Sequence, residues 1–106
     1  MDSSKYWIEF LPIAKQDMTD IARYISQELF NPTEAIELAD EMIENADRLR
    51  DFPYINSIHQ TIKPLNHEYR KLVVKNYIMF YWIDEDQKSV TIARVLYAKR
   101  DYEELL

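Results

Sequence analysis

The spacing of the hydrophobic residues changes from a helical period to a strand period partway along this chain of 106 residues. Between residues 14 and 49, apolar side chains recur every three or four positions, which places them on one stripe of a helix. From residue 68 to 97 they alternate or run together, which is typical of half-buried and fully buried strands. The pattern therefore predicts an α+β fold in which helices precede a sheet.

The helical part is expected to follow a short first strand. Residues 6–11 are rich in aromatic and β-branched side chains and end at Pro12, which predicts a strand. One apolar stripe then runs from Ala14 to about Leu29 and predicts the first helix.

A second helix is expected over residues 32–49. Asn31 is the predicted cap, because Pro32 suits the first helical position and Glu34 lies three residues past the cap. Since the connection between the two helices is short, they are expected to form an antiparallel hairpin.

Three strands are expected in the second half of the chain. Residues 68–75 and 90–97 predict two of them, and residues 77–83 are apolar on both faces, which predicts a central strand between them. The intervening Lys75-Asn76 predicts a tight turn in which Asn76 takes the positive φ angle.

The remaining segments complete the expected order. Residues 54–67 show no period and predict a loop, and residues 99–106 are long enough for a short helical tail. The expected architecture is β-α-α-β-β-β, with or without a final α, in which the first strand and the helical hairpin pack on a C-terminal antiparallel meander. One domain is expected to cover residues 1–106.

The chain contains no glycine and no cysteine. Phosphate-binding loops need glycine so that backbone N–H groups can approach the ligand, and this excludes a P-loop and a dinucleotide fingerprint. Without cysteine there is no disulfide or thiolate metal site, which suits a reducing compartment. No apolar run approaches the roughly 20 residues of a membrane span, and residues 1–5 lack the order of a signal peptide. We expect a cytoplasmic protein with no cofactor, no metal and no membrane partner.

The net charge of −6 is distributed unevenly. Residues 1–57 carry 5 basic and 12 acidic side chains, whereas residues 58–106 carry 8 basic and 7 acidic ones. Polyanion binding depends on cations that neutralise phosphates, so the first half is a poor nucleic-acid surface. The second half offers either a modest basic patch or an ordinary solvated face. The basic side chains within residues 63–83 are Lys63, Arg70, Lys71 and Lys75.

Four segments occur in an order that spans nearly the whole chain. They are Ala14-(x2)-Asp17-Met18-(x2)-Ile21-(x2)-Tyr24-Ile25; Asn31-Pro32 with a helix ending at Leu49-(x2)-Phe52-Pro53; Tyr69-Arg70-Lys71-Leu72-Val73-Val74 with Asn76-Tyr77-Ile78-Met79-Phe80-Tyr81; and Ala93-Arg94-Val95-Leu96-Tyr97-(x2)-Arg100-Asp101-Tyr102-(x2)-Leu105-Leu106. This ordered set resembles the RelE/ParE superfamily, the toxins of bacterial type II toxin–antitoxin systems. The first and last segments are closer to its ParE-like plasmid-stabilisation branch.

The resemblance implies one of two activities. ParE-like toxins inhibit DNA gyrase by binding, whereas RelE-like toxins cleave mRNA on the ribosome without a metal; an antitoxin neutralises both by wrapping around the toxin. We favour the ParE-like activity, because this chain has Ile78 where the nuclease pattern Gly-Tyr-Arg has its arginine. The alternatives are the RelE-like endoribonuclease and an inactive relative that retains only antitoxin binding. A dimer or a hetero-oligomer with the antitoxin is the implied assembly.

The resemblance also indicates candidate site residues. Matched by position, the candidates for a catalytic role are Arg70, Lys71, Arg100 and Tyr102, which would supply cations for a phosphate and a group for proton transfer. Neighbouring residues of a strand point to opposite faces, so at most one of Arg70 and Lys71 meets a given ligand. For antitoxin binding, Tyr24 and Phe30 are expected to form part of an apolar groove.

Arg94, the two histidines and the acidic face of the second helix are further candidate functional features. Arg94 either pairs with a carboxylate of the helices or lines a functional cleft. His59 and His67 are expected in ordinary surface positions, without a zinc site. The acidic face of the second helix is either simply solvated or contacts a basic stretch of the antitoxin.

Overall fold

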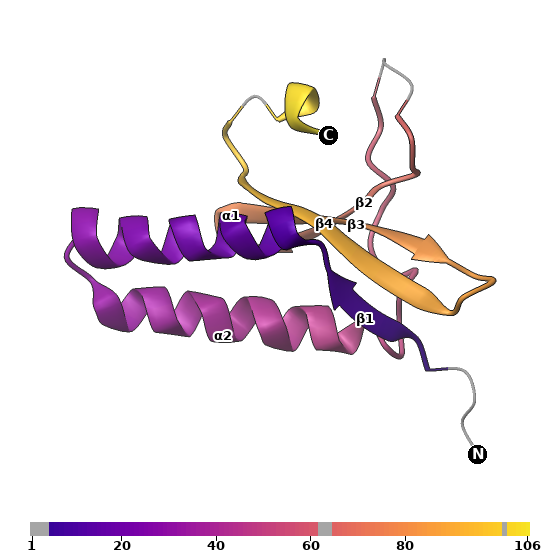
Figure 1. The fold of residues 1–106 in the computed structure, drawn as a ribbon, viewed down its shortest axis with the longest axis horizontal. Coiled ribbons are helices and arrows are strands. Elements are labelled where there is room, and N and C mark those ends of the chain that lie inside the picture. The colour runs from indigo at the N-terminus through magenta and orange to yellow at the C-terminus, as the bar shows by residue number, and fades with distance from the viewer. Residues whose placement is uncertain (1–4, 62–64, 101) are drawn as a thin grey trace.

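Two helices and a four-stranded sheet form the body of the protein, and a C-terminal tail lies above the sheet (Figure 1). A computed structural model describes residues 5–61, 65–100 and 102–106. The elements are β1 (Trp7–Phe10), α1 (Pro12–Arg23), a π-helical turn (Tyr24–Glu28), α2 (Pro32–Arg48), β2 (Arg70–Val74), β3 (Tyr77–Asp84), β4 (Ser89–Tyr97) and a 3-10 turn (Glu103–Leu105). The α+β architecture and the order β-α-α-β-β-β are confirmed, and the predicted helical tail is a single 3-10 turn.

The sheet has the strand order β1-β4-β3-β2. Strands β2, β3 and β4 form the predicted antiparallel meander, and β3 is flanked on both sides, as its two-sided apolar sequence predicts. The first strand, β1, pairs in parallel with β4 at the edge. The register of β3 and β4 shifts between Phe80 and Tyr81, because Ala93 is an extra residue of β4 that bulges between their partners.

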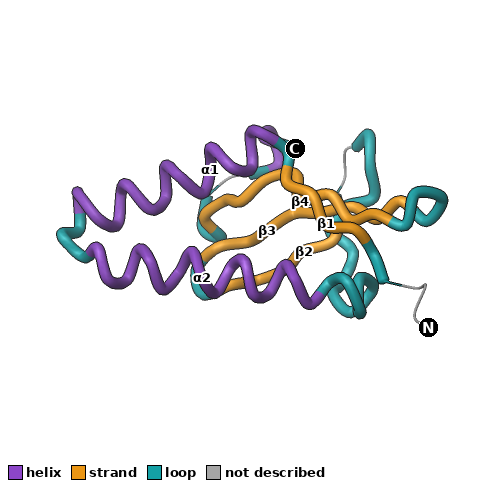
Figure 2. Tube along the Cα trace, turned by 60° about the horizontal axis from the view of Figure 1, so that its bottom comes forward, coloured by secondary structure: helices purple, strands orange, loops and turns teal. Residues whose placement is uncertain are grey.

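The helical hairpin covers one face of the sheet. Helices α1 and α2 run antiparallel beside each other (Figures 1 and 2). The main core, which we call the helix-side core, lies between them and the sheet; its largest fully buried side chains include Met42, Leu49, Met79 and Tyr81. Small alanines at Ala14, Ala35 and Ala46 let the helices approach closely.

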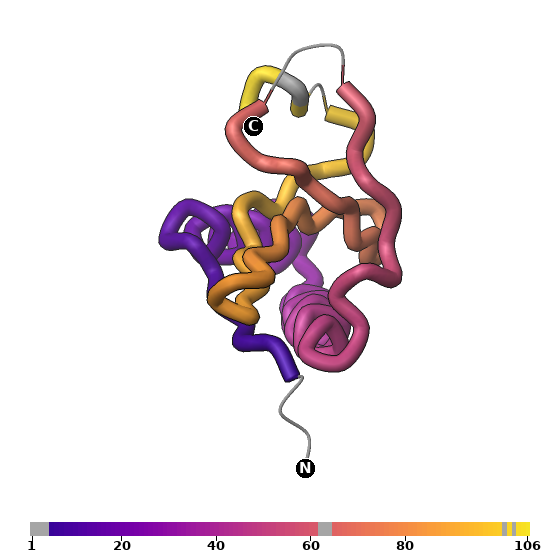
Figure 3. The backbone as a smooth tube through the Cα atoms, turned by 90° about the vertical axis from the view of Figure 1, so that its right-hand side faces the viewer, coloured from indigo at the N-terminus to yellow at the C-terminus, as the bar shows by residue number. Residues whose placement is uncertain are grey.

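The opposite face of the sheet carries a smaller core, which we call the outer cluster. Its buried residues are Tyr69, Ile78, Phe80, Ala93 and Leu96, with Leu65, Trp82, Tyr102, Leu105 and Leu106 packed against them. Figure 3 shows α2 and the C-terminal tail on opposite sides of the sheet. The sheet is therefore buried on both faces along the middle of its strands.

The start of α2 follows the sequence expectation, whereas the β2–β3 turn does not. The Asn31 side chain accepts a hydrogen bond from the Glu34 backbone N–H at 3.2 Å and donates one to the Glu34 carboxylate at 3.1 Å, so the predicted cap is confirmed. In the β2–β3 turn the positive φ of 53° belongs to Lys75, and its assignment to Asn76 was wrong. Among the described residues, no helix has the length and apolarity to cross a bilayer.

Candidate functional site

A groove of about 540 Å³ lies where the end of α1 meets the β2–β3 turn and the end of β4. Its lining residues are Asp17, Asp20, Ile21, Tyr24, Leu29, Asn76, Tyr77, Val95, Leu96, Tyr97 and Arg100. The lining is therefore mixed: aromatic and aliphatic walls, with carboxylates on the helix side and one guanidinium on the strand side. Such a surface suits a protein segment that presents apolar side chains together with charges.

Three tyrosines supply the aromatic part of this groove. Tyr77 opens β3 and Tyr97 closes β4; the two are paired across the ladder, and their ring centroids lie 5.7 Å apart. Tyr24 comes from the π-helical turn and is 52% exposed. Burial raises the pKa of the Tyr77 hydroxyl, so this group remains a neutral hydrogen-bond donor throughout the physiological range.

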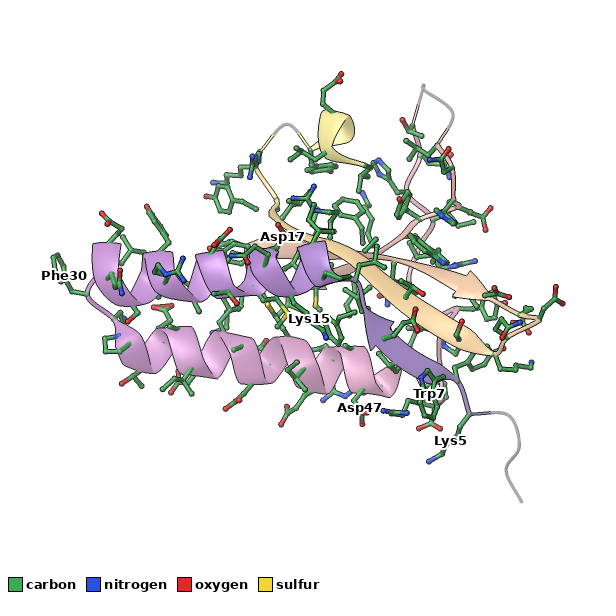
Figure 4. The ribbon with its side chains drawn as sticks, in the orientation of Figure 1. Lys5, Trp7, Lys15, Asp17, Phe30 and Asp47 are labelled. Carbon is green, nitrogen blue, oxygen red and sulfur yellow. The ribbon has the colours of Figure 1, made fainter. Side chains whose placement is uncertain are left out.

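The π-helical turn sets where Tyr24 and the residues after it point. The α-helical ladder ends at Arg23, and the Leu29 N–H then donates to the Tyr24 carbonyl five residues earlier at 3.2 Å. Phe30 follows with a left-handed φ of 53° and is 85% exposed at the tip of the hairpin (Figure 4). The left-handed φ angle and the exposed phenyl ring both make the folded state less stable. Destabilising features of this kind are often found at functional positions.

The structure brings only some of the candidate residues together. Arg100 and Tyr24 line the same groove, and Phe30 lies beyond Leu29, at the hairpin tip outside the groove lining. Tyr77 and Tyr97 were missed from the sequence, although their places at the two ends of a predicted hairpin would have paired them.

Arg70 and Lys71 lie away from that groove and on different faces of the sheet. The Arg70 guanidinium donates to the Asn56 carbonyl at 2.6 Å and lies 5.0 Å from the centre of the Tyr54 ring. It therefore holds the segment after α2 against the sheet. Lys71 pairs with Phe80 in the ladder, on the face of the outer cluster. Lys75 lies 3.8 Å from the Glu41 carboxylate, and Lys63 of the predicted basic patch lies outside the described residues.

Tyr102 belongs to the outer cluster, together with a histidine that was expected at the surface. Its ring lies 5.1 Å from Phe80 and 5.8 Å from His59, centroid to centroid. His59 is only 7% exposed, so the expectation of a surface position was wrong; its backbone N–H donates to the Tyr69 carbonyl at 2.7 Å, which draws the loop under the tail. His67 is exposed, as expected, and stacks on Trp82 at 3.6 Å.

Arg94 pairs with a carboxylate of the helices, the first of its two interpretations. Its Nε and Nη2 donate to the two oxygens of Asp17 at 2.8 and 2.9 Å, and its Nη1 donates to the Leu105 carbonyl at 3.2 Å. The Val95 N–H also donates to Asp17, at 2.9 Å. This pair raises the pKa of Arg94 and ties α1, β4 and the C-terminal tail together at the edge of the groove.

Comparison with known proteins found one family model and several similar structures. The model, described as the ParE toxin of the type II toxin–antitoxin system parDE, matches residues 8–102. The chromosomal ParDE system of P. aeruginosa has a structure that aligns with a TM-score of 0.73 at 15% identity, over 92% of this chain and 100% of that one. No curated protein sequence matches.

Two further solved structures share the fold. The RelE–RelB complex of the archaeon Pyrococcus horikoshii aligns with a TM-score of 0.62 at 11% identity, over 91% of this chain and 98% of that one. The RelBE2 toxin–antitoxin complex of Mycobacterium tuberculosis aligns with a TM-score of 0.56 at 21% identity, over 92% and 98%. At these identities the likeness establishes the fold, and the family model carries the assignment to a family.

Proposed function

Because the chain belongs to the ParE family of toxins from type II toxin–antitoxin systems, we propose that it inhibits DNA gyrase by binding and that a cognate antitoxin neutralises it. The proposal has two parts, the partner that occupies the groove and the target. A gyrase inhibitor acts in the cytoplasm, which is the location we propose.

The groove and the hairpin tip together form the surface that we propose for the antitoxin. Leu29 is 55% exposed and Phe30 is 85% exposed, so the tip presents apolar area that a partner would remove from water. Arg100 at the strand side would pair with a carboxylate of that partner. An amphipathic segment with apolar side chains and at least one acid fits this lining.

The distribution of cations is the observation that supports gyrase binding over RNA cleavage. Stabilising a phosphate in a transition state needs cations that converge on one point. Arg94 is committed to Asp17, and Arg70 is committed to the Asn56 carbonyl. Arg100 lines a groove on the helix side, whereas Lys71 lies on the face of the outer cluster. At position 78 the side chain is a buried isoleucine.

One observation favours the alternative, a RelE-like endoribonuclease. Lys71 pairs with Phe80, and the Phe80 ring also contacts Tyr102 and His59, so a cation, a phenol and an imidazole share one face of the sheet. These are groups able to transfer protons or bind a phosphate. His59 is buried next to Tyr102 of the C-terminal tail, so the tail would have to move before a nucleic acid could reach the imidazole.

Expression of the chain alone in growing cells, followed by purification for gyrase assays, tests the proposal. We expect filamentous growth arrest, and loss of supercoiling when the purified chain is added to gyrase. Cut mRNA with an unaffected gyrase would replace the proposal with the nuclease alternative. Normal growth with no effect on gyrase would instead indicate a relative that only binds an antitoxin.

The antitoxin surface is tested separately with the product of the neighbouring gene. Tyr24→Ala and Phe30→Ala should each weaken binding, because each removes an exposed aromatic ring from the proposed surface. Phe52→Ala is the matched control, since Phe52 is 62% exposed but lies past the other end of α2. Equal affinities for the three variants and the parent would remove the groove and tip from consideration.

A further inference from the structure

A second hollow, of about 570 Å³, lies at the other end of the sheet from the groove. Its lining residues are Trp7, Glu9, Trp82, Asp84, Gln87, Ser89 and Thr91. Gln87 lies in the β3–β4 turn, and the others come from the start of β1 and β4 and the end of β3, on the sheet face that is opposite the helices. The C-terminal tail covers the middle of this face and leaves this end open.

Strand pairing arranges these side chains in two rows. Ser89 of β4 pairs with Trp7 on one side and with Asp84 on the other. Two residues further along β4, Thr91 pairs with Glu9 on one side and Trp82 on the other. The middle strand thus supplies a floor of two small hydroxyl side chains, and each flanking strand supplies one indole and one carboxylate. The two indoles therefore lie diagonally across the floor from each other, and so do the two carboxylates.

Both carboxylates of the hollow have hydrogen-bonding capacity left. Asp84 accepts the Gln87 backbone N–H at 3.1 Å, and Glu9 lies 3.5 Å from the Thr91 hydroxyl. Within the described part of the chain neither carboxylate is in an ion pair, and the hollow has no basic lining residue. The nearby Lys88 is held by Glu85 at 2.9 Å. A cation entering the hollow would therefore meet two unneutralised negative charges.

The two indoles make the hollow selective for a flat cation. Trp7 is 68% exposed, which is unusual for so large an apolar ring on a strand. Trp82 is held by stacking on His67 at 3.6 Å, so that its position is set before a ligand arrives. Indole is the aromatic ring that attracts cations most strongly, and a guanidinium can stack on it while it donates to a carboxylate.

We propose that this hollow binds an arginine side chain from a basic segment of a partner protein. The guanidinium would lie over the Ser89–Thr91 floor, donate to Glu9 or Asp84, and stack against an indole. The inference goes beyond gyrase inhibition and antitoxin binding in the groove, since it rests on different residues at the other end of the sheet. The acidic lining repels polyanions, so the occupant is a peptide segment and not a nucleic acid.

The test follows the indole N–H signals of Trp7 and Trp82 in ¹H–¹⁵N spectra of the whole chain. The probe is acetyl-Gly-Arg-Gly-amide, and the control is the same peptide with citrulline, which keeps the shape of arginine but lacks its charge. We expect the arginine peptide to shift both signals with saturation, at an affinity that falls as salt is added. The citrulline peptide should bind at least several-fold more weakly.

Single variants then assign the binding to these residues. Glu9→Gln, Asp84→Asn and Trp7→Leu should each weaken arginine binding by about two- to five-fold, the effect of one exposed ion pair or cation–π contact. Glu37→Gln removes a charge that is also exposed, but on α2, and should leave arginine binding unchanged. Equal shifts with the arginine and citrulline peptides, no response to the three hollow variants, or tighter binding of spermidine than of the arginine peptide would each overturn the proposal.

Discussion

Replacing Asp17 by alanine tests the physical basis of this fold at its most connected polar contact. The Asp17 carboxylate accepts two hydrogen bonds from Arg94 and one from the Val95 backbone N–H, so it joins α1 to the last strand. The side chains of Asp17 and Arg94 are only 12% and 15% exposed, and water therefore screens the pair weakly. Asp17→Ala would leave a guanidinium and a backbone donor largely buried without their acceptor.

Asp17→Ala is expected to lower the free energy of unfolding strongly, because Asp17 and Arg94 form their ion pair largely shielded from water. Breaking such an ion pair from one side costs about 3–5 kcal/mol. A domain of this size has a total free energy of unfolding of about 5–15 kcal/mol, so the variant would lose at least about a fifth of it. With a urea m-value of about 1.5 kcal/mol/M, the unfolding midpoint would fall by about 2–3 M.

Urea unfolding followed by tryptophan fluorescence measures this loss. The matched control is Asp47→Ala, which breaks the Asp47–Arg50 pair at 2.6 Å; its side chains are 65% and 42% exposed, so it should cost less than about 1 kcal/mol. Figure 4 shows Asp17 on α1 and Asp47 near the end of α2. The double variant Asp17→Leu/Arg94→Met should recover part of the loss, because no buried charge remains although the Val95 N–H still lacks its acceptor. Equal costs for Asp17→Ala and Asp47→Ala would refute the reasoning.

Two further predictions concern Glu85 in the β3–β4 turn and the Asn31 cap of α2. Hydrogen bonds from the Tyr54 and Tyr6 hydroxyls and from Lys88 lower the pKa of Glu85 from 4.5 to about 2, so its stabilising effect is present above pH 4.5 and is lost as the pH falls toward 2. Glu85→Gln should therefore flatten the pH dependence of urea unfolding between pH 5 and 2, and an unchanged slope would contradict this assignment. Asn31→Ala should lower the free energy of unfolding by about 1 kcal/mol through loss of the α2 cap; a cost no greater than that of the exposed Thr33→Ala would count against the cap.

The sequence alone predicted a helix or strand correctly wherever the local pattern of residues is compatible with only one type of element. The apolar stripes of residues 14–29 and 35–49, the cap at Asn31 and the two-sided apolar strand 77–83 each specify an element through contacts within a few residues. Their errors are small shifts at element ends. The positive φ at Lys75 instead of Asn76 is one of these, since the hairpin register decides which residue of a turn takes that angle.

The candidate site was only half predictable for the same reason. Tyr24 and Arg100 were proposed separately, and it is the return of β4 beside α1 that places them in one groove. Arg70, which a strand pattern cannot distinguish from a free cation, is tied to Asn56 fourteen positions earlier in the chain. His59 is buried because the loop folds beneath the C-terminal tail. The hydrophobic periodicity of neighbouring residues cannot predict this contact.

What the amino-acid order alone determined is therefore the type and succession of the elements, because helix and strand periods are properties of neighbouring residues. What the tertiary structure decided is which side chains meet. The parallel pairing of β1 with β4 joins Trp7 and Glu9 to Thr91 and Trp82, and the Asp17–Arg94 pair spans 77 positions. Contacts between residues so far apart in the sequence form only when the strands pair and the helices pack on the sheet. Both the groove and the indole-lined hollow depend on such contacts.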